Sequence, residues 1–309
     1  MSNLHHEFDL IAHAHSLAAR HPNLAIGIGD DAALVRLPDP TGCLVTVDML
    51  MEGVDFTLDS ATGRQIGWKS LAVNLSDIAA MAGKPVACVV SVALPRRGGF
   101  ELGRELLAGI TQCAARFDVA LAGGDTNTWE GPLVISVTVL GEPTGAGPVL
   151  RSGARPGDWI VTTGSFGGSI SGRHLEFVPR IEEALLLHKT VALHAMIDTS
   201  DGLAADLWHI LEESHVAAVI DEPAISVSPA ARAIDDGRTP LDHALADGED
   251  FELLFTVSPA DGQKLLRAPP FNTPLTHIGE IVAGAGCQLR LPDGSLKPLA
   301  ALGWKHAFE

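Results

Sequence analysis

Carboxylate residues recur in this chain where an apolar run ends and a glycine, serine or threonine stands nearby. The segments that share this pattern are Gly29-Asp30-Asp31, Val47-Asp48, Ser76-Asp77, Gly124-Asp125, Asp198-Thr199-Ser200-Asp201 and Gly248-Glu249-Asp250. Carboxylate oxygens are hard ligands that suit Mg2+, and several such ions can hold a polyphosphate beside acidic side chains. The pattern therefore predicts nucleotide chemistry with several Mg2+ ions.

The net charge favours the same interpretation. The 309 residues include 21 Lys and Arg against 38 Asp and Glu, which gives a net charge of −17 with His neutral. Such a charge repels nucleic acid and anionic membranes, so we expect neither as a partner. A phosphorylated substrate would be repelled as well, and bound cations are needed to offset that repulsion.

Composition predicts a soluble cytoplasmic protein with enough apolar material for two domains. Apolar residues make up 46% of the chain. No apolar stretch reaches the roughly 18 residues of a membrane-spanning helix. The cysteines have no Cys-x-x-Cys spacing, so we expect neither a disulfide framework nor a zinc site. They are Cys43, Cys88, Cys113 and Cys287.

The first half of the chain alternates between strand and helix patterns. Helices are expected at 4–19, 68–82 and 101–117, strands at 43–48, 86–94 and 133–140, and a turn at 27–31. In the second of these helices, an apolar stripe that includes Leu71 is predicted to pack, because its residues recur at the helical period. Ser70, Asn74 and Asp77 lie on another face, where their oxygens could meet a ligand.

The second half has the same alternation and begins after an irregular connection. Segment 141–157 contains five Gly and three Pro in 17 residues, a composition that disfavours regular structure. We place the domain boundary there, with domains at 1–145 and 146–309. Strands are expected at 158–163, 195–197, 217–220 and 252–257, and helices at 181–194 and 202–214. This order predicts an α/β or α+β architecture.

The common phosphate-binding motifs are missing. Residues 63–70 come close to a Walker P-loop, but Trp68 separates Gly67 from Lys69. The His-Arg-Asp and Asp-Phe-Gly signatures of protein kinases are also absent. Turn 164–168 could cradle a phosphate with its backbone amides or could simply link a strand to a helix. We therefore expect a site where carboxylates from distant segments converge around metal ions.

Six motifs together resemble the thiamine-monophosphate kinase family, which belongs to the aminoimidazole ribonucleotide synthetase superfamily. They are Gly27-Ile28-Gly29-Asp30-Asp31, the segment 71–81, Gly123-Gly124-Asp125, the segment 151–158, the segment 197–202 and Gly248-Glu249-Asp250. Their order matches the family from about Phe8 to Trp304. The resemblance implies a homodimer in which the N-terminal sheets of two chains pair, each followed by a larger C-terminal α+β domain.

The resemblance also implies the reaction and the residues that serve it. The γ-phosphoryl group of ATP would pass directly to thiamine phosphate, giving thiamine diphosphate. The implied Mg2+ ligands are Asp31, Thr46, Asp48, Asp77, Asp125, Asp198 and Asp201. The implied nucleotide contacts are Gly124, Asp125, Arg151 and Ser200, and the acceptor residues are Asp55, Glu249 and Phe308. Because a phosphate acceptor is already ionised at neutral pH, no general base is needed, and Asp48, Asp77 and Asp125 act as a metal clamp.

Three features differ from the family pattern. Asp55 stands where a histidine is usual, the segment after Gly168 is short, and the chain has no Tyr, so that Phe308 would replace a stacking tyrosine. These features keep open an enzyme of the same superfamily that uses ATP with another small acceptor. A nucleotide-binding regulatory or assembly protein without turnover is the alternative from another class.

Overall fold

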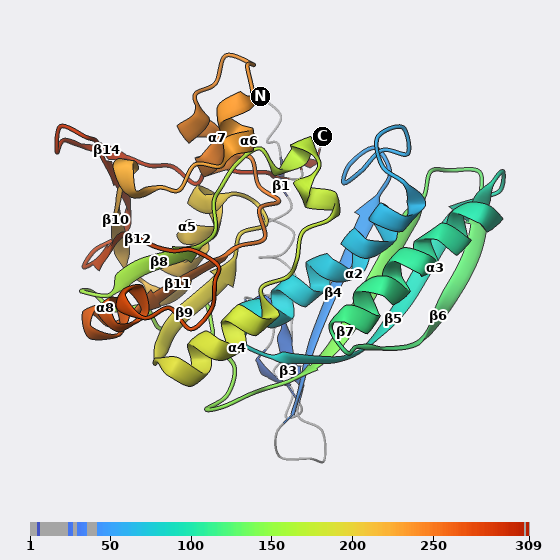
Figure 1. Ribbon diagram of the computed structural model, residues 1–309, viewed down its shortest axis with the longest axis horizontal. Coiled ribbons are helices and arrows are strands. Elements are labelled where there is room, and N and C mark those ends of the chain that lie inside the picture. The colour runs from blue at the N-terminus through green and yellow to red at the C-terminus, as the bar shows by residue number, and fades with distance from the viewer. Residues whose placement is uncertain (1–4, 7–23, 27–29, 36–41, 306, 309) are drawn as a thin grey trace.

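A computed structural model describes residues 5–6, 24–26, 30–35, 42–305 and 307–308 of the chain. Two large sheets dominate it, one of six strands and one of seven, with helices packed between and around them (Figure 1). No helix within these residues is long and apolar enough to cross a bilayer. All four cysteines are free thiols.

The six-stranded sheet is built from the first half of the chain in the order β2-β3-β4-β7-β5-β6. Its strands are β2 (Leu24–Ile26), β3 (Ala33–Val35), β4 (Cys43–Met51), β5 (Lys84–Pro95), β6 (Ala120–Trp129) and β7 (Val134–Glu142). The strands expected at 43–48, 86–94 and 133–140 are confirmed, and each is longer than predicted. Strand β6 was not predicted, because Gly123 and Gly124 weaken the strand pattern there. It pairs in parallel with β5 at the edge of the sheet.

Helices α2 (Gly63–Ala80) and α3 (Gly99–Arg116) lie side by side over one face of this sheet (Figure 1). The Thr62 hydroxyl caps the start of α2, and the Gln65 side chain returns a bond to the Thr62 backbone. A side chain at Gly109 would collide with the Arg64 carbonyl, so this glycine permits the close contact of the two helices. The expected helix at 68–82 is confirmed, although it begins earlier.

Helix α2 differs from the expectation of one packed face and one open face. Lys69, Ser70, Asn74 and Ser76 are all buried, as are the apolar residues around them. The helix therefore lies largely inside the molecule, and these four polar residues are enclosed by protein.

The other face of the six-stranded sheet, called here the outer face, is exposed and apolar. Val47 and Met49 of β4 are 60% and 59% exposed. Further apolar residues exposed in the same sheet are Val86, Val89, Trp129 and Leu140.

The seven-stranded sheet has the order β14-β13-β10-β12-β8-β11-β9. Its strands are β8 (Trp159–Thr163), β9 (Leu193–Asp198), β10 (Ala217–Asp221), β11 (Leu253–Val257), β12 (Leu275–Val282), β13 (Gly286–Arg290) and β14 (Leu296–Pro298). The α-helices that accompany it are α4 (Ile181–Thr190), α5 (Leu203–Ser214), α6 (Pro229–Ala233), α7 (Pro240–Ala246) and α8 (Pro259–Arg267). Short 3-10 helices are η1 (Ser169–Ser171), η2 (Arg173–Leu175) and η3 (Glu222–Ala224).

The four strands expected in this half are confirmed, but one helix was predicted too long. The expected helix at 181–194 ends at Thr190, and residues from Leu193 onward form β9 instead. The β-branched Thr190 and Val191 lie at this change of structure, where helix propensity is low. Helix 202–214 is confirmed as α5.

One hydrophobic core connects both sheets. Leu253 and Phe255 of β11 pack into the core that also contains Leu71 and Leu75 of α2. Leu254 points the opposite way, into a second core with α5. The seven-stranded sheet is therefore covered on both faces, and α2 lies between the two sheets. The connection from β7 to β8 contains the predicted boundary at residues 145 and 146, which stays a prediction.

The two ends of the described chain pair with each other. Strand β1 (His5–His6) is antiparallel to β15 (Ala307–Phe308). The expected helix at 4–19 is wrong at residues 5 and 6, and its remainder lies outside the described residues. The expected turn at 27–31 falls mostly outside them as well.

Candidate active site

Three carboxylates from distant segments converge between the two sheets. Asp31 precedes β3, Asp77 lies in α2 and Asp198 ends β9, yet one ligand oxygen from each lies within 4.8 Å of the others. This acidic cluster contains three of the residues that the sequence predicts as metal ligands. Two ligands on opposite sides of a Mg2+ ion are about 4.2 Å apart, so the cluster has dimensions that suit such a cation.

Each carboxylate of the acidic cluster is fixed by a neighbour. The Ser76 hydroxyl donates a 2.5 Å hydrogen bond to Asp198, and the Thr46 hydroxyl donates to Asp77. Arg151 donates through Nε and Nη2 to the two oxygens of Asp31, each at 2.9 Å. These contacts orient the acids and leave the guanidinium of Arg151 engaged with Asp31.

Burial and mutual repulsion make the cluster costly to ionise. Burial, with the charges of Asp48 and Asp198, raises the pKa of Asp77 well above its usual value. Burial, followed by the charge of Asp31, raises the pKa of Asp198 to about 8. Burial and the charge of Asp55 raise the pKa of Asp48 to about 6. A site that must neutralise so much negative charge is chemically suited to divalent cations.

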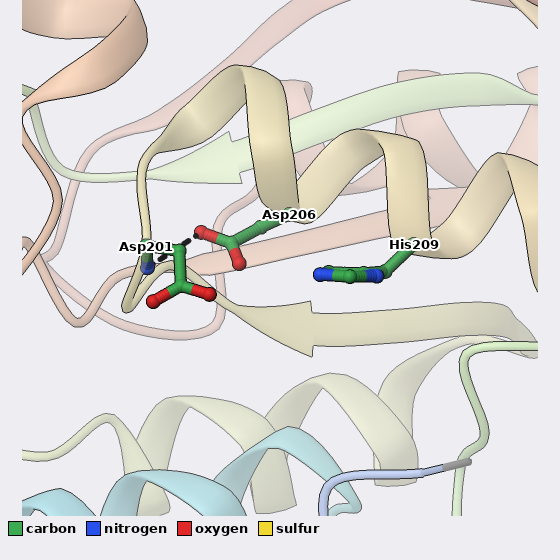
Figure 2. Close-up of side chains that lie close together, drawn as sticks. All are labelled: Asp201, Asp206 and His209. Atoms are coloured by element: carbon green, nitrogen blue, oxygen red, sulfur yellow. Dashed lines mark hydrogen bonds between the residues drawn. The ribbon is translucent and has the colours of Figure 1, made fainter. Parts of the chain in front are cut away.

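A second group of potential ligands adjoins the first. Ligand atoms of Asp201, Asp206 and His209 lie within 4.8 Å of one another (Figure 2). The Asp206 carboxylate accepts hydrogen bonds from the backbone N–H groups of Asp201, at 3.2 Å, and Gly202, at 3.0 Å, and so fixes the turn that carries Ser200. Burial, with the positive charge of Arg151, lowers the pKa of His209 to about 4, so its ring is neutral.

The sequence analysis missed Asp206 and His209. Their spacing of three residues places both on one face of α5, directly after the motif that contains Asp201. That spacing is a signal that could have identified them.

Glu249 pairs with Lys69, which the sequence analysis considered only as part of a P-loop motif that residues 63–70 do not match. Lys69 is fully buried, and its Nζ lies 2.8 and 2.6 Å from the two oxygens of Glu249. It also donates to the backbone carbonyl of Asp55 at 2.8 Å. The Asp55 carboxylate accepts from the backbone N–H of Met51 at 2.7 Å. Asp55 and Glu249, two of the three predicted acceptor residues, therefore belong to one bonded group.

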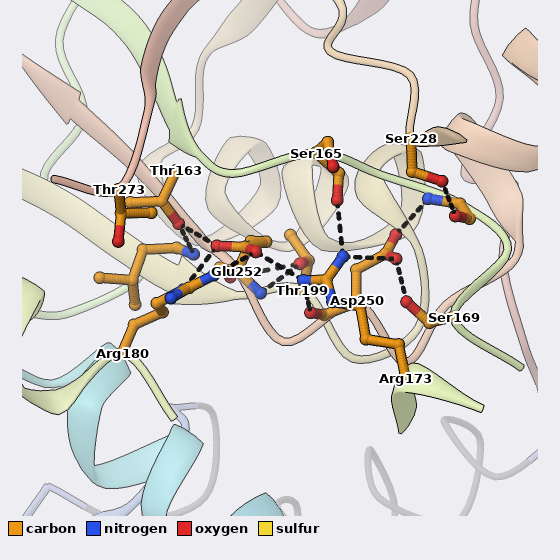
Figure 3. Close-up of polar contacts among 12 residues, drawn as sticks. Thr163, Ser165, Ser169, Arg173, Arg180, Thr199, Ser228, Asp250, Glu252 and Thr273 are labelled. Atoms are coloured by element: carbon orange, nitrogen blue, oxygen red, sulfur yellow. Dashed lines mark hydrogen bonds and ion pairs between the residues drawn. The ribbon is translucent and has the colours of Figure 1, made fainter. Parts of the chain in front are cut away.

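A buried network of acids and arginines stabilises the segment after β8. Glu252 accepts hydrogen bonds from Thr163, Arg173 and Arg180 (Figure 3). Asp250 accepts from the Ser169 hydroxyl at 2.5 Å and from the backbone N–H of Gly167 at 2.7 Å. The short segment from Gly164 to Arg180 is thus tied firmly to the turn that carries Glu249.

The same contacts decide between the two interpretations of turn 164–168. The amide of Gly167 donates to Asp250, and the amide of Gly168 donates to Asp247 at 2.9 Å. Because carboxylates already occupy both amides, the turn serves to connect β8 with η1, and these two groups are not a phosphate cradle here.

Two predicted site residues lie apart from the acidic cluster. Gly124 and Asp125 belong to the exposed edge strand β6. Asp125 is paired with Ser91 of β5, Ser91 with Ser136 of β7, and Ser136 with Met49 of β4. Side chains of paired residues lie on the same face of a sheet, and Met49 lies on the outer face. Within one chain, Asp125 is therefore on the side of the sheet opposite α2 and Asp77.

The last predicted residues occupy other positions. Ser200 lies in the turn between Asp198 and Asp201, and its carbonyl accepts from the Glu249 backbone N–H at 2.6 Å. Phe308 lies in β15, and its side chain is outside the described part of the structure.

The chain is similar to proteins of one known family. Residues 29–142 match the family "AIR synthase related protein, N-terminal domain". The thiamine-monophosphate kinase of Rhodopirellula baltica is 38% identical over 97% of both chains. Among solved structures, AaThiL complexed with AMPPCP and TMP is 29% identical, with a TM-score of 0.83 and 97% of each chain covered. The thiamine-monophosphate kinase of Stenotrophomonas maltophilia K279a is 34% identical, with a TM-score of 0.74, covering 96% of this chain and 100% of the other.

The two-sheet fold and the match of residues 29–142 define a protein of the AIR synthase related class, as the resemblance predicted. The identity of 38% with the Rhodopirellula baltica protein over nearly the whole chain identifies one family within that class. The chain belongs to the thiamine-monophosphate kinase family.

Proposed function

We propose that this protein is an ATP-dependent kinase that phosphorylates thiamine phosphate to thiamine diphosphate. The observation that carries the proposal is the convergence of Asp31, Asp77 and Asp198, whose ligand oxygens lie close enough together to hold a cation. Relatives named for this activity span almost the whole chain, and the similar AaThiL structure contains AMPPCP and TMP. ATP is the co-substrate in this proposal.

We assign several Mg2+ ions to the site, with Asp31, Asp48, Asp77, Asp198 and Asp201 as their ligands. When bound, the ions neutralise phosphate oxygens and favour the charge distribution of phosphoryl transfer. The fit rests on the buried, closely spaced acids whose pKa values are raised in the absence of a cation. Thr46 and Ser76 would contribute by holding two of these acids in fixed orientations.

The chain's own residues then have positioning tasks. The phosphate of the acceptor is largely ionised near neutral pH, so no side chain has to remove a proton from it. Catalysis depends instead on alignment of the two phosphates in a preorganised site. Arg151 and Ser200 would stand at the nucleotide side, and Glu249 and Asp55 at the acceptor side.

We further propose that two copies of the chain pair through the outer face. Apolar residues such as Val47 and Met49 would lose their contact with water in that pairing. It would also give Gly124 and Asp125 a place in a site that one chain does not give them. Phe308 as an acceptor contact and the cytoplasm as the compartment remain predictions from the sequence.

The test is direct. Purified protein is incubated with ATP, Mg2+ and thiamine phosphate, and thiamine diphosphate is separated and quantified. We expect stoichiometric ADP and thiamine diphosphate. Binding of ATP without transfer to any small phosphorylated acceptor would support the regulatory alternative, and transfer only to another acceptor would support the second enzymatic one.

A further inference from the structure

The Lys69 side chain is fully buried in α2, which is uncommon for a lysine. A buried ammonium is tolerated when its donors are satisfied and an opposite charge is close. Lys69 meets both conditions through the Glu249 carboxylate and the Asp55 carbonyl. Its Nζ is therefore committed to protein groups and does not itself present a charge to a substrate.

The position of Lys69 on α2 relates it to the acidic cluster. Lys69 and Ser76 are seven residues apart, which places them on the same face of the helix about 10 Å apart along its axis. Each binds a different turn of the second half: Lys69 binds Glu249, and Ser76 binds Asp198. Helix α2 thus holds two turns at a fixed separation.

The two turns are also bonded to each other. The Glu249 backbone N–H donates to the Ser200 carbonyl at 2.6 Å, and the Thr199 backbone N–H donates to the Glu252 carbonyl at 2.8 Å. Glu249 adopts a left-handed backbone conformation with φ 55°, which is uncommon for a residue with a side chain. This conformation lets Glu249 reach Lys69 while the next acids, Asp250 and Glu252, bind the segment after β8.

The Glu249 side chain remains 27% exposed although Lys69 binds both of its carboxylate oxygens. The carboxylate is thus held in one orientation beside the turn that runs from Asp198 to Asp201, and part of the Glu249 side chain is accessible. A partly accessible carboxylate attracts a cationic ring such as the thiazolium of thiamine phosphate. The phosphate of that molecule would then extend toward the acidic cluster, which lies about 10 Å further along α2.

We propose that Lys69 is a positioning residue for the phosphate acceptor, which it serves by fixing Glu249 and the Asp55 turn at a set distance from the acidic cluster. The inference rests on the proposed function, since that function supplies the acceptor. Lys69 links α2 of the first half with the Glu249 turn of the second and touches neither substrate.

The test compares Lys69→Met, which keeps length and removes charge, with Lys69→Arg, which keeps the charge. Lys264→Met is the matched control, because Lys264 also donates to a backbone carbonyl, that of Thr190, but is exposed. For Lys69→Met we expect kcat/KM for thiamine phosphate to fall about 100-fold, while KM for ATP changes less than about threefold. Lys69→Arg should recover at least about a tenth of the wild-type value.

A double variant separates positioning from general damage. Lys69→Met combined with Glu249→Gln should lose little more acceptor kcat/KM than Lys69→Met alone, because both changes break the same contact. Equal losses toward ATP and acceptor, or an unchanged acceptor kcat/KM in folded Lys69→Met, would overturn the inference. If Lys69→Met does not fold, Lys69→Gln, which removes the charge but keeps a hydrogen-bond donor, gives the same comparison between the two substrates.

Failure of the proposed function is recognised separately. If the wild-type protein makes no thiamine diphosphate, the function is wrong, and calorimetric titration with thiamine phosphate then tests Lys69 alone. Binding that weakens at least about tenfold in Lys69→Met but not in Lys264→Met supports the positioning role. Equal binding by both variants, or none by the wild type, contradicts it.

Discussion

Ser76 donates a 2.5 Å hydrogen bond to Asp198 across 122 residues of sequence and so joins helix α2 to the end of strand β9. The neighbouring Asp77 contributes its carboxylate to the same cluster. Adjacent residues of one helix thus supply a ligand and the support for a second ligand from the other sheet. The geometry of the cluster therefore depends on how α2 packs against β9.

Replacement of Ser76 by Ala is expected to weaken metal binding more than it weakens the fold. The variant loses one hydrogen bond to a charged group, worth about 2 kcal/mol, and frees the Asp198 carboxylate to reorient. We expect the Mg2+ concentration for half-maximal activity to rise about tenfold. Ser70→Ala is the control, since the Ser70 hydroxyl bonds only within α2, to Gly67. An equal effect of both changes would contradict the role of Ser76.

Replacement of Asp77 by Asn should abolish most turnover without unfolding the protein. One charge of the acidic cluster disappears, while the amide keeps the size of the side chain. We expect kcat to fall at least about 100-fold at saturating ATP and thiamine phosphate. Without Mg2+ the variant should melt no earlier than the wild type, because a buried, repelled acid is gone. Asp59→Asn, at an exposed turn, serves as control; a wild-type rate in folded Asp77→Asn would refute the assignment.

Stability of the metal-free protein should fall as the pH rises. The pKa of Asp198 lies near 8 in the folded chain, above the ordinary value of 3.8, so the folded state binds the extra proton. The resulting stabilisation is complete below about pH 4 and is lost as the pH rises through about 8. In EDTA we expect a lower melting temperature at pH 8.5 than at pH 6.

Added Mg2+ should reverse this trend, because it binds the ionised carboxylates and releases their protons. Asp198→Asn should show a weaker dependence on pH in EDTA than the wild type. A melting temperature that rises between pH 6 and pH 8.5 in EDTA, in the wild type, would argue against the buried acids described above.

A charge placed on the outer face should separate the proposed dimer. Met49→Glu puts a carboxylate at a position that is 59% exposed in one chain and would be covered in two. We expect sedimentation velocity to show dimer for the wild type and monomer for the variant, with activity reduced at least about tenfold. Leu296→Glu, at an exposed position of β14, is the control and should remain dimeric. A monomeric, fully active wild type would exclude the pairing.

Local sequence patterns predicted the helix that carries Asp77 and the strand that delivers Asp198. The strand that contains Asp48 and the helix that contains Asp77 could be predicted from a few neighbouring residues, because alternation and the helical period are local properties of the sequence. Strand β6 could not, since Gly123 and Gly124 gain their conformation from pairing with β5. A side chain at Gly124 would collide with the Val90 carbonyl, and that contact is visible only in the folded chain.

The partners of charged residues were the least predictable part of the site. Lys69 lies next to Trp68 in a segment that does not match the P-loop motif. The residues around it in the sequence give no indication that its partner is Glu249, 180 residues away. Arg151 and Asp31 are likewise far apart in sequence. Such pairs are set by how the two sheets meet around α2, which local periodicity does not encode.

The enclosure of α2 by both sheets has a consequence for how the chain is made. During synthesis, residues 63–80 emerge well before β9 and β11, which supply the apolar side chains that finally cover them. Until about five-sixths of the chain has emerged, Leu71 and its neighbours lack part of their cover, a condition that favours aggregation or capture by chaperones. The N-terminal half of the enzyme thus reaches its native state only together with the C-terminal half.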